Sequence, residues 1–325
     1  MKIIRKRIGQ GVLGVLIAAN GVPAALAVEV PTASGIKLDI LTQGKFQPTY
    51  FSNFDLDSSV DDGATGTSAG GVQVGDEHVR AEVRLGVVAT GDNWTGKILL
   101  ENDFALDANS VDRAYRGERF GLEQAFFTYT FDPAFTLQGG WTFKNLDLAS
   151  GGLLYGDDHP LFGATGKTSF GSYDVFWMPI TDGLISDIQA PGANPANGEL
   201  DWDVFASKFD IDLGKGSRIS PILTYSDNQQ KGAKATYYGV EYIGNVGAMK
   251  VRAEALGVTG SFDNGDDISA FAGYASLEYP LNESFNPFIA LRVASGDDDP
   301  TDNDVEGWLG ITDIGRYSPL IGIDG

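Results

Sequence analysis

Residues 78–100 read HVRAEVRLGVVATGDNWTGKILL, and this stretch decides the fold. Charged or polar residues alternate in it with apolar ones: His78, Arg80, Glu82 and Arg84 against Val79, Ala81, Val83, Leu85 and Val87. A period of two places the two sets on opposite faces of a β-strand. After a tight turn at 90–93, Trp94, Ile98 and Leu100 alternate with Lys97 and Glu101. The stretch therefore predicts a β-hairpin with one apolar and one polar face.

The same pattern recurs along the chain, with short turns around 132–134, 214–217, 244–247 and 280–284. Longer polar connections separate these hairpins: Asp55 to Asp76, Ala105 to Phe120, Asn145 to about Pro160, Asp182 to Asp201, Asp227 to Lys234, Phe262 to Asp267 and Asp297 to Glu306. Short turns at one rim and longer loops at the other are typical of outer-membrane barrels. One strand, near Leu161 to Gly166, follows from parity alone, because an even number of strands must separate Phe143 from Trp202.

We therefore predict an all-β protein: a transmembrane, antiparallel, up-and-down β-barrel whose apolar face meets lipid and whose charged face lines a watery lumen. A sheet can span a membrane only when it closes, because lipid offers no partner to a free backbone group. Pro48, Pro221 and Pro287 lie in or near predicted strands and remove ladder donors there. They keep open the alternative of a soluble lectin-like or jelly-roll protein.

The first 27 residues have the layout of a secretory signal peptide. Lys2, Arg5, Lys6 and Arg7 precede an apolar run from Val12 to Ala19, and the triplet Ala25–Leu26–Ala27 follows. This order predicts cleavage after Ala27 and a barrel domain at 28–325. Without the leader, 19 basic residues face 44 acidic ones, a formal charge of −25. Such a charge excludes a nucleic-acid partner, which requires a basic patch, and the lack of cysteine excludes disulfides.

The strand count predicts that the natural protein extends beyond Gly325. Roughly thirteen strands are recognisable, and bacterial single-chain barrels have even numbers, so we expect about 14 strands in this chain and about 16 to 18 in the complete protein. We also expect a gap between the strands at Lys37 to Phe51 and Asn286 to Ser295, and no defined position for residues 307–325.

The overall alternation resembles that of Gram-negative outer-membrane porins. A sharper local resemblance covers Arg292 to Asp304, RVASGDDDPTDND, which is similar to the strand end and Asp-Pro loop of alginate-export-type porins. The resemblance implies an outer-membrane pore for passive diffusion of small hydrophilic solutes or ions. Its implied partners are membrane lipid, lipopolysaccharide and, as an option, two further copies in a homotrimer; no cofactor is implied. A dedicated channel for an oligosaccharide or acidic polysaccharide is the alternative within transport.

Charged residues on the polar parity are the predicted pore lining: Arg80, Glu82, Arg84, Lys97, Glu101, Asp103, Lys208, Asp210, Arg218, Glu241, Lys250, Arg252, Glu254 and Arg292. Both signs occur, so the lining is mixed and lacks the basic pathway that a polyanion requires. The set could orient a polar solute in a transverse field, or only solvate the interior and pair across strands.

The segment from Lys144 to Pro160 is less polar than the other long connections. Porins commonly fold one loop inward to narrow the pore, so Asp157, Asp158 and His159 are candidates for a constriction; an ordinary surface loop is the alternative. The aromatic residues near strand ends are expected to form membrane girdles: Tyr50, Phe51, Trp94, Trp141, Trp202, Tyr225, Tyr279 and Phe285.

Two further chemistries are weaker options. Asp297, Asp299, Asp302 and Asp304 offer oxygen ligands to a divalent cation, but their spacing does not match an EF-hand, so a solvated loop is preferred. His78 and His159 are the only histidines, and no Gly-x-Ser-x-Gly elbow accompanies them. We therefore predict no catalytic residues; a barrel-embedded hydrolase and a non-conducting structural surface protein stay as alternatives.

Overall fold

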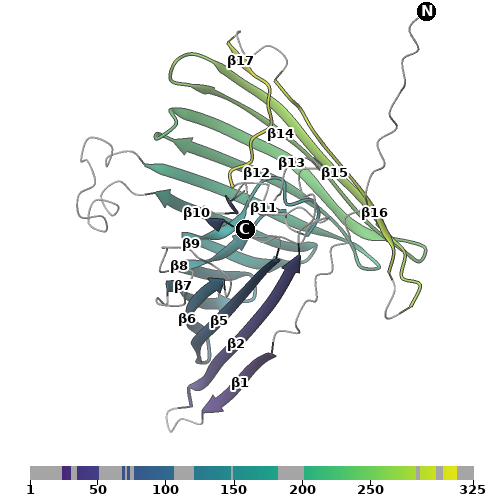
Figure 1. The fold of residues 1–325 in the computed structure, drawn as a ribbon. Coiled ribbons are helices and arrows are strands. Elements are labelled where there is room, and N and C mark those ends of the chain that lie inside the picture. Colours follow the sequence, from purple (N-terminus) through teal and green to yellow (C-terminus); the bar gives the residue numbers. More distant parts are fainter. Residues whose placement is uncertain are drawn as a thin grey trace, which may run out of the picture.

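The computed structural model describes residues 24–30, 35–50, 68–69, 72–73, 77–105, 121–147, 149–181, 201–282, 286–297 and 303–312. Side chains at 24–30, 46–50, 68–80, 103–105 and 181 are not among those described. The described residues form one curled sheet and a small separate hairpin (Figure 1). The strands are β1 (Ala24–Val30), β2 (Lys37–Tyr50), β3 (Ser68–Ala69), β4 (Val72–Gln73), β5 (Glu77–Thr90), β6 (Trp94–Ala105), β7 (Gly121–Asp132), β8 (Phe135–Asn145), β9 (Gly156–Thr168), β10 (Gly171–Thr181), β11 (Trp202–Gly214), β12 (Ser217–Asn228), β13 (Ala233–Val246), β14 (Met249–Phe262), β15 (Asp267–Glu278), β16 (Phe288–Ala294) and β17 (Asp304–Val305).

Strands that follow one another in the main sheet pair antiparallel, in the order β1-β2-β5-β6 and then consecutively to β16. The predicted all-β, up-and-down class is therefore confirmed. The sheet is open, since no pairing joins its first and last strands within the described residues. No helix in that part of the chain is long and apolar enough to cross a membrane.

The hairpin predicted from residues 78–100 is formed by β5 and β6. Its register runs from Arg80 opposite Ala105 to Thr90 opposite Thr95. Leu85 and Val87 are exposed on one face, whereas Glu82 is buried on the other. The strand inferred near Leu161 to Gly166 is β9. Together with β10 it supplies the two strands between β8 and β11, so the parity argument is confirmed.

Two-residue turns join the strands at one rim, which we call the tight-turn rim. The turns at 133–134, 169–170, 215–216 and 247–248 lie there, and so does the bend at 91–93. Lys215 adopts a φ of 55° between two glycines that also have positive φ, a conformation in which type I′ hairpin turns place their central residues. Of the predicted long connections Asp55 to Asp76, Ala105 to Phe120 and Asp182 to Asp201, residues 55–67, 106–120 and 182–200 lie outside the described residues.

Pro221 lies in the middle of β12, opposite Val240 of β13. On the other side of the strand, the register with β11 passes from Lys208↔Ile222 to Ile211↔Ile219. Proline has no backbone N–H to donate to a neighbouring strand, and the pairing with β11 is interrupted at this position. The proline therefore does not exclude the central strand that alternation predicts.

The two edges of the sheet are β1 and β16. The predicted open sheet is therefore confirmed, but its first edge is β1 and not the predicted strand at Lys37 to Phe51. β1 pairs with β2 from Ala24↔Gly44 to Val30↔Leu38, so the predicted cleavage site after Ala27 lies within this strand. The expectation that 307–325 holds no defined position is wrong for 307–312: Trp308 and Ile311 are buried, because they pack into the interior of the sheet. Residues 313–325 lie outside the described part.

The interior is divided into two bands, which corrects the prediction of a uniformly watery lumen. Toward the rim opposite the tight turns, apolar inward-facing side chains of β10 to β15 form one buried cluster, which includes Met178, Val204, Tyr237, Leu256, Val258, Ala270 and Ala272. Thr224 and Ser226 of β12 are buried polar exceptions in this band. Toward the tight-turn rim the inward positions are charged or polar. Alternation predicts which face of the sheet a residue takes. It does not predict that distant segments of the chain pack over the apolar band and bury it.

Candidate functional site

Residues 146–155 connect β8 to β9 and fold into the concave face of the sheet; we call them the inner segment. Leu146, Leu153, Leu154 and Tyr155 are buried in the apolar cluster. The segment is shorter than the loop predicted from Asn145 to Pro160. Asp157, Asp158 and His159 instead belong to β9, where they pair with Lys144, Phe143 and Thr142 of β8. They are strand residues because β8 continues to Asn145 and gives β9 a partner from Gly156 onward.

Asp147 shapes the inner segment from within. Its Oδ2 accepts hydrogen bonds from the backbone N–H groups of Leu153 and Leu154, and its Oδ1 accepts one of 3.1 Å from Tyr155. One carboxylate thus satisfies three successive buried donors that no strand could pair. Burial raises the pKa of Asp147, and the backbone donors oppose that rise. The residue is fully buried and closes the segment into a compact turn.

Polar groups at the tip of the inner segment contact charged side chains of the sheet. Ser150 Oγ donates to Glu241 Oε2 at 2.8 Å, and the N–H of Gly151 donates to Glu254 Oε2 at 3.2 Å. The carbonyl oxygen of Gly151 accepts a bond of 2.8 Å from Arg292. A Cβ atom at residue 151 would lie 2.5 Å from Glu254 Oε2 and 2.8 Å from Tyr274 Cβ, so a side chain here would push these neighbours aside. The tip is therefore held from β13, β14 and β16.

Glu241 of β13 is the centre of a second set of contacts. Its Oε1 accepts from Lys208 Nζ at 3.0 Å and from Arg218 Nη2 at 3.3 Å. Lys208 also donates to the carbonyl oxygen of Leu146 at 2.5 Å, at the start of the inner segment. Because Glu241 is fully buried, its charge requires these partners. Two cations and a hydroxyl supply them.

A second segment, 303–312, covers the inner segment from the opposite side. β17 pairs in parallel with β15, and Trp308 Nε1 then donates to the carbonyl oxygen of Leu153 at 3.1 Å. The backbone N–H of Ile311 donates to the carbonyl oxygen of Leu154 at 2.9 Å. The indole ring of Trp308 also meets the ring of Tyr237 edge-on. The two segments form one packed unit, although 155 residues separate Trp308 from Leu153.

A separate ionic cluster lies on β5, β6 and β7. The guanidinium of Arg84 contacts Glu82 at 2.9 Å and Glu123 at 3.0 Å, and it also pairs with Glu101. Lys97 donates to Gln124 Oε1 at 2.7 Å on the same face. Three carboxylates surround this arginine, and Lys45, 3.7 Å from Glu82, and Lys97 balance their charge on this wall of the interior.

The remaining predicted lining residues have simpler positions. Lys250 and Arg252 of β14 share the carboxylate of Glu278, at 2.8 Å and 3.5 Å. Arg80 and Asp103 lie in β5 and β6, but their side chains are not among those described. Asp297 and Asp304 are exposed, and Asp299 and Asp302 lie outside the described residues. In the part of the chain that is described, no three acidic or histidine side chains gather as a metal site would require.

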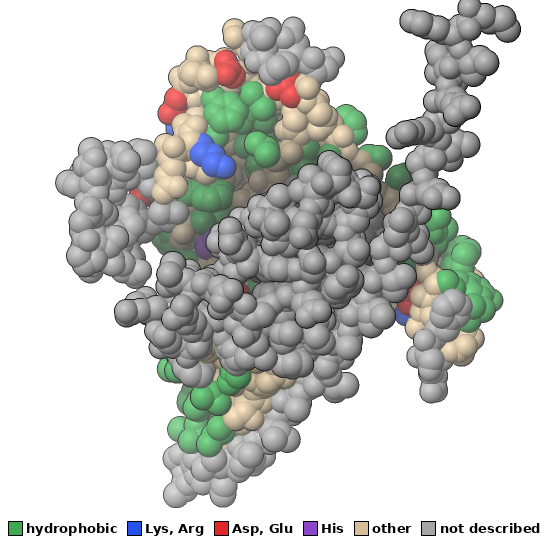
Figure 2. Space-filling view, viewed as in Figure 1, with side chains coloured by type: hydrophobic (Ala, Val, Ile, Leu, Met, Phe, Trp, Pro, Cys, Tyr) green, Lys and Arg blue, Asp and Glu red, His purple; other side chains and the backbone are tan. Residues whose placement is uncertain are grey.

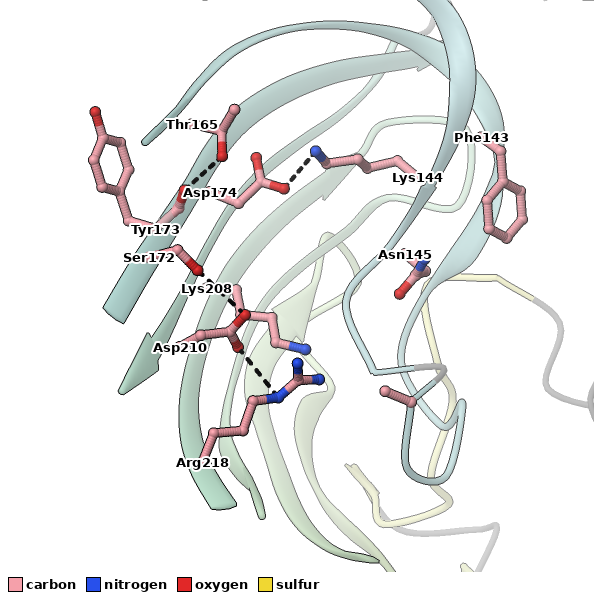
Figure 3. Close-up of a pocket in the computed structure, with 11 residues that line it drawn as sticks. Phe143, Lys144, Asn145, Thr165, Ser172, Tyr173, Asp174, Lys208, Asp210 and Arg218 are labelled. Atoms are coloured by element: carbon pink, nitrogen blue, oxygen red, sulfur yellow. Dashed lines mark hydrogen bonds and ion pairs between the residues drawn. The ribbon is translucent and has the colours of Figure 1, made fainter. Parts of the chain in front are cut away.

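A cavity of about 420 Å³ lies between the inner segment and strands β8 to β12 (Figure 3). Its charged lining consists of Lys144, Asp174, Lys208, Asp210 and Arg218. Lys144 and Asp174 point toward one another and form an ion pair, while Lys208 and Arg218 reach in the same direction toward the inner segment. Asp210 and Arg218 approach to 3.8 Å. The cavity lies on the polar side of the boundary between the two bands.

The outer face of the sheet is apolar and exposed. Large hydrophobic side chains with more than a third of their surface exposed occur on every strand from β5 to β16, among them Ile98, Phe127, Trp141, Phe162, Trp177, Phe205, Leu223, Tyr238, Phe271 and Leu291. In the view of Figure 2, acidic side chains gather near the turns at the top. Trp202 departs from the predicted girdle, since it packs against the buried cluster and donates to Ser226 Oγ. Tyr50, Phe51 and Phe285 lie outside the described side chains.

Sequence reasoning missed four residues that build this site: Asp147, Ser150, Gly151 and Trp308. The signal available was the low polarity of 151–155, which did predict an unusual connection but not which residues anchor it. No protein-family model matches the chain, and no curated protein is similar enough in sequence to count as a relative.

Proposed function

We propose that this protein is an outer-membrane porin that allows passive diffusion of small hydrophilic solutes or ions. The observation that carries the proposal is the two-faced sheet. Its outer face exposes large apolar side chains from β5 to β16, while charged side chains line the concave face toward the tight-turn rim. A water-soluble protein rarely exposes so large an apolar surface, whereas a lipid-embedded barrel requires one. The predicted signal peptide accords with export to that membrane.

The inner segment favours small solutes over a polymer. It occupies the concave face beside the cavity of about 420 Å³, and it is bonded to β11, β13, β14 and β16. A polysaccharide would need a continuous wide path, and its acidic form would also need a cationic one. The cluster around Arg84 has as many described carboxylates as cations, so it does not offer that cationic path. Catalysis gains no support from His159, whose Nδ1 lies 2.9 Å from the hydroxyl of Tyr155.

Single-channel recording in a planar lipid bilayer tests the proposal. The full-length protein, folded in detergent and added to one side, should produce discrete steps with ohmic conductance. The steps should be small, because the inner segment narrows the interior, and neutral polymers of increasing size should stop entering at a low molecular weight. Protein that inserts into vesicles, as shown by protease protection, yet never conducts would refute the pore and leave a structural role.

A further inference from the structure

The cavity beside the inner segment has an uneven supply of hydrogen-bonding groups. The side-chain oxygens of its two acidic residues are already engaged. Asp210 Oδ1 accepts from Ser220 Oγ at 2.6 Å and its Oδ2 from Ser172 Oγ at 3.5 Å. Asp174 pairs with Lys144 and accepts from Gln138 at 3.0 Å. The carboxylates that face the cavity are therefore engaged by groups of the protein.

The donors are less fully used. A guanidinium carries five N–H donors, and the described residues engage that of Arg218 with one hydrogen bond, to Glu241 at 3.3 Å. Its Nε is buried without a hydrogen-bond partner among those residues, because Asp210 is 3.8 Å away. About a third of the side chain, 37%, is exposed. Arg218 thus has accessible donors that a ligand could engage.

A second cation stands next to Arg218. Lys208 and Arg218 both donate to the same oxygen of Glu241, at 3.0 Å and 3.3 Å, so their charged groups converge. Glu241 is fully buried behind them, whereas both cations line the cavity. Figure 3 shows the two side chains reaching toward the same space beside Asn145. Arg218 and Lys208 thus place two cationic groups at this end of the cavity, beside the single carboxylate of Asp210, which already accepts from two serines.

We propose that this cavity is a binding site for a small hydrophilic solute that carries a carboxylate. Arg218 binds the carboxylate through its free N–H donors, Lys208 adds charge, and Thr165 and Asn145 offer polar contacts to hydroxyl groups of the solute. Arginine binds carboxylates well because its planar fork matches their two oxygens. The inference names the solute class of the proposed porin and rests on that function for its transport role, although binding itself does not require a pore.

Titration calorimetry with the full-length protein in detergent, at low ionic strength, tests the site. The probe is gluconate, and sorbitol is the matched solute with the same carbon chain and no charge. Gluconate should bind with one site per chain, and sorbitol should not. Arg218→Gln should weaken gluconate binding by about tenfold or more, as expected for the loss of a charge-assisted contact. Lys234→Gln removes a cation that pairs with Asp227 outside the cavity and should leave the affinity unchanged.

The variants keep the outcome interpretable. Arg218→Gln could unfold the site by leaving Glu241 short of a partner. Lys144→Gln therefore provides an independent measurement: it removes a cation from the opposite wall of the cavity and should also weaken the binding of gluconate. Equal affinity of gluconate for the wild type and both cavity variants, or equal binding of sorbitol, would overturn the site. Bilayer recording separates the two proposals. A protein that binds gluconate but does not conduct overturns the pore alone. A protein that conducts, with a conductance that gluconate does not reduce, overturns the site alone.

Discussion

The guanidinium of Arg292 donates a hydrogen bond of 2.8 Å to the carbonyl oxygen of Gly151. Arg292 lies on β16, the last strand of the sheet, and Gly151 lies at the tip of the inner segment. The contact therefore connects the edge of the sheet to the segment that fills its concave face. Three further contacts hold the tip and the start of that segment, from Glu241, Glu254 and Lys208.

Arg292→Gln should loosen the inner segment without unfolding the sheet. A hydrogen bond from a charged donor contributes about 1.5–3 kcal/mol. Backbone amides of residues 150–155 should then exchange with deuterium roughly ten to a hundred times faster, as measured by mass spectrometry, while amides of β12 and β13 keep their protection. Lys234→Gln is the charge-matched control. Unchanged exchange at 150–155 would mean that the contact does not hold the segment.

Asp147→Ala should disrupt the inner segment more strongly. It removes the acceptor for three backbone donors, at Leu153, Leu154 and Tyr155, and a buried donor left unsatisfied costs about 1–3 kcal/mol. Limited proteolysis of the folded protein should then cut within 146–155. Asp147→Asn keeps one of the two oxygens and should give an intermediate rate. If the alanine variant resists protease as the wild type does, the carboxylate is not what shapes the segment.

Replacement of Trp308 should separate the packing of the indole from its hydrogen bond. Trp308→Ala removes a buried ring that contacts Tyr237, and such truncations cost about 3–5 kcal/mol. Trp308→Phe retains most of the ring and loses the bond to Leu153, about 0.5–1.5 kcal/mol. Urea unfolding in detergent should therefore rank the alanine variant well below the phenylalanine variant. Equal losses would contradict burial of the ring between the two segments.

Arginine on the outer face distinguishes lipid from water as the surrounding medium. Leu223, 55% exposed, lies in the middle of β12, and Leu213, 56% exposed, lies beside the tight turn at 215–216. In a bilayer, arginine costs about 2–4 kcal/mol at the midplane and about 0–1 near the interface. Leu223→Arg should thus reduce folding into vesicles far more than Leu213→Arg. Equal and small effects would indicate a surface that faces water.

Alternation along the chain was sufficient for the strands and for which face each residue takes. Leu85 and Val87 point outward and Glu82 inward, as a period of two requires, and the parity of the turns even placed β9, which has weak alternation of its own. These features depend on local geometry that repeats along a strand. An open sheet was predicted as well, but from an odd number of strands, whereas the path from β1 to β16 has fourteen strands.

The interior could not be predicted in the same way, because its contacts join distant parts of the chain. Nothing local to Trp308 indicates that its indole meets Leu153, and nothing local to Met178 or Val204 indicates that these inward positions are dry. Charged inward residues such as Glu241 suggested a watery lumen, and that prediction fails where the inner segment covers β10 to β15. The predicted end of the connection at Pro160 failed for a related reason: β9 begins at Gly156, because β8 gives it a partner from there onward.

The two bands of the interior have a consequence for how freely this sequence can vary. Near the tight-turn rim, an inward side chain such as Lys250 is almost half exposed, so many replacements there should be neutral. Six and eight residues further along the same strand, Leu256 and Val258 are packed, and loss of even a single methylene group should lower stability. Evolutionary drift should therefore be fast at one end of each strand from β11 to β15 and slow at the other, with the outward positions between them changing freely among apolar residues.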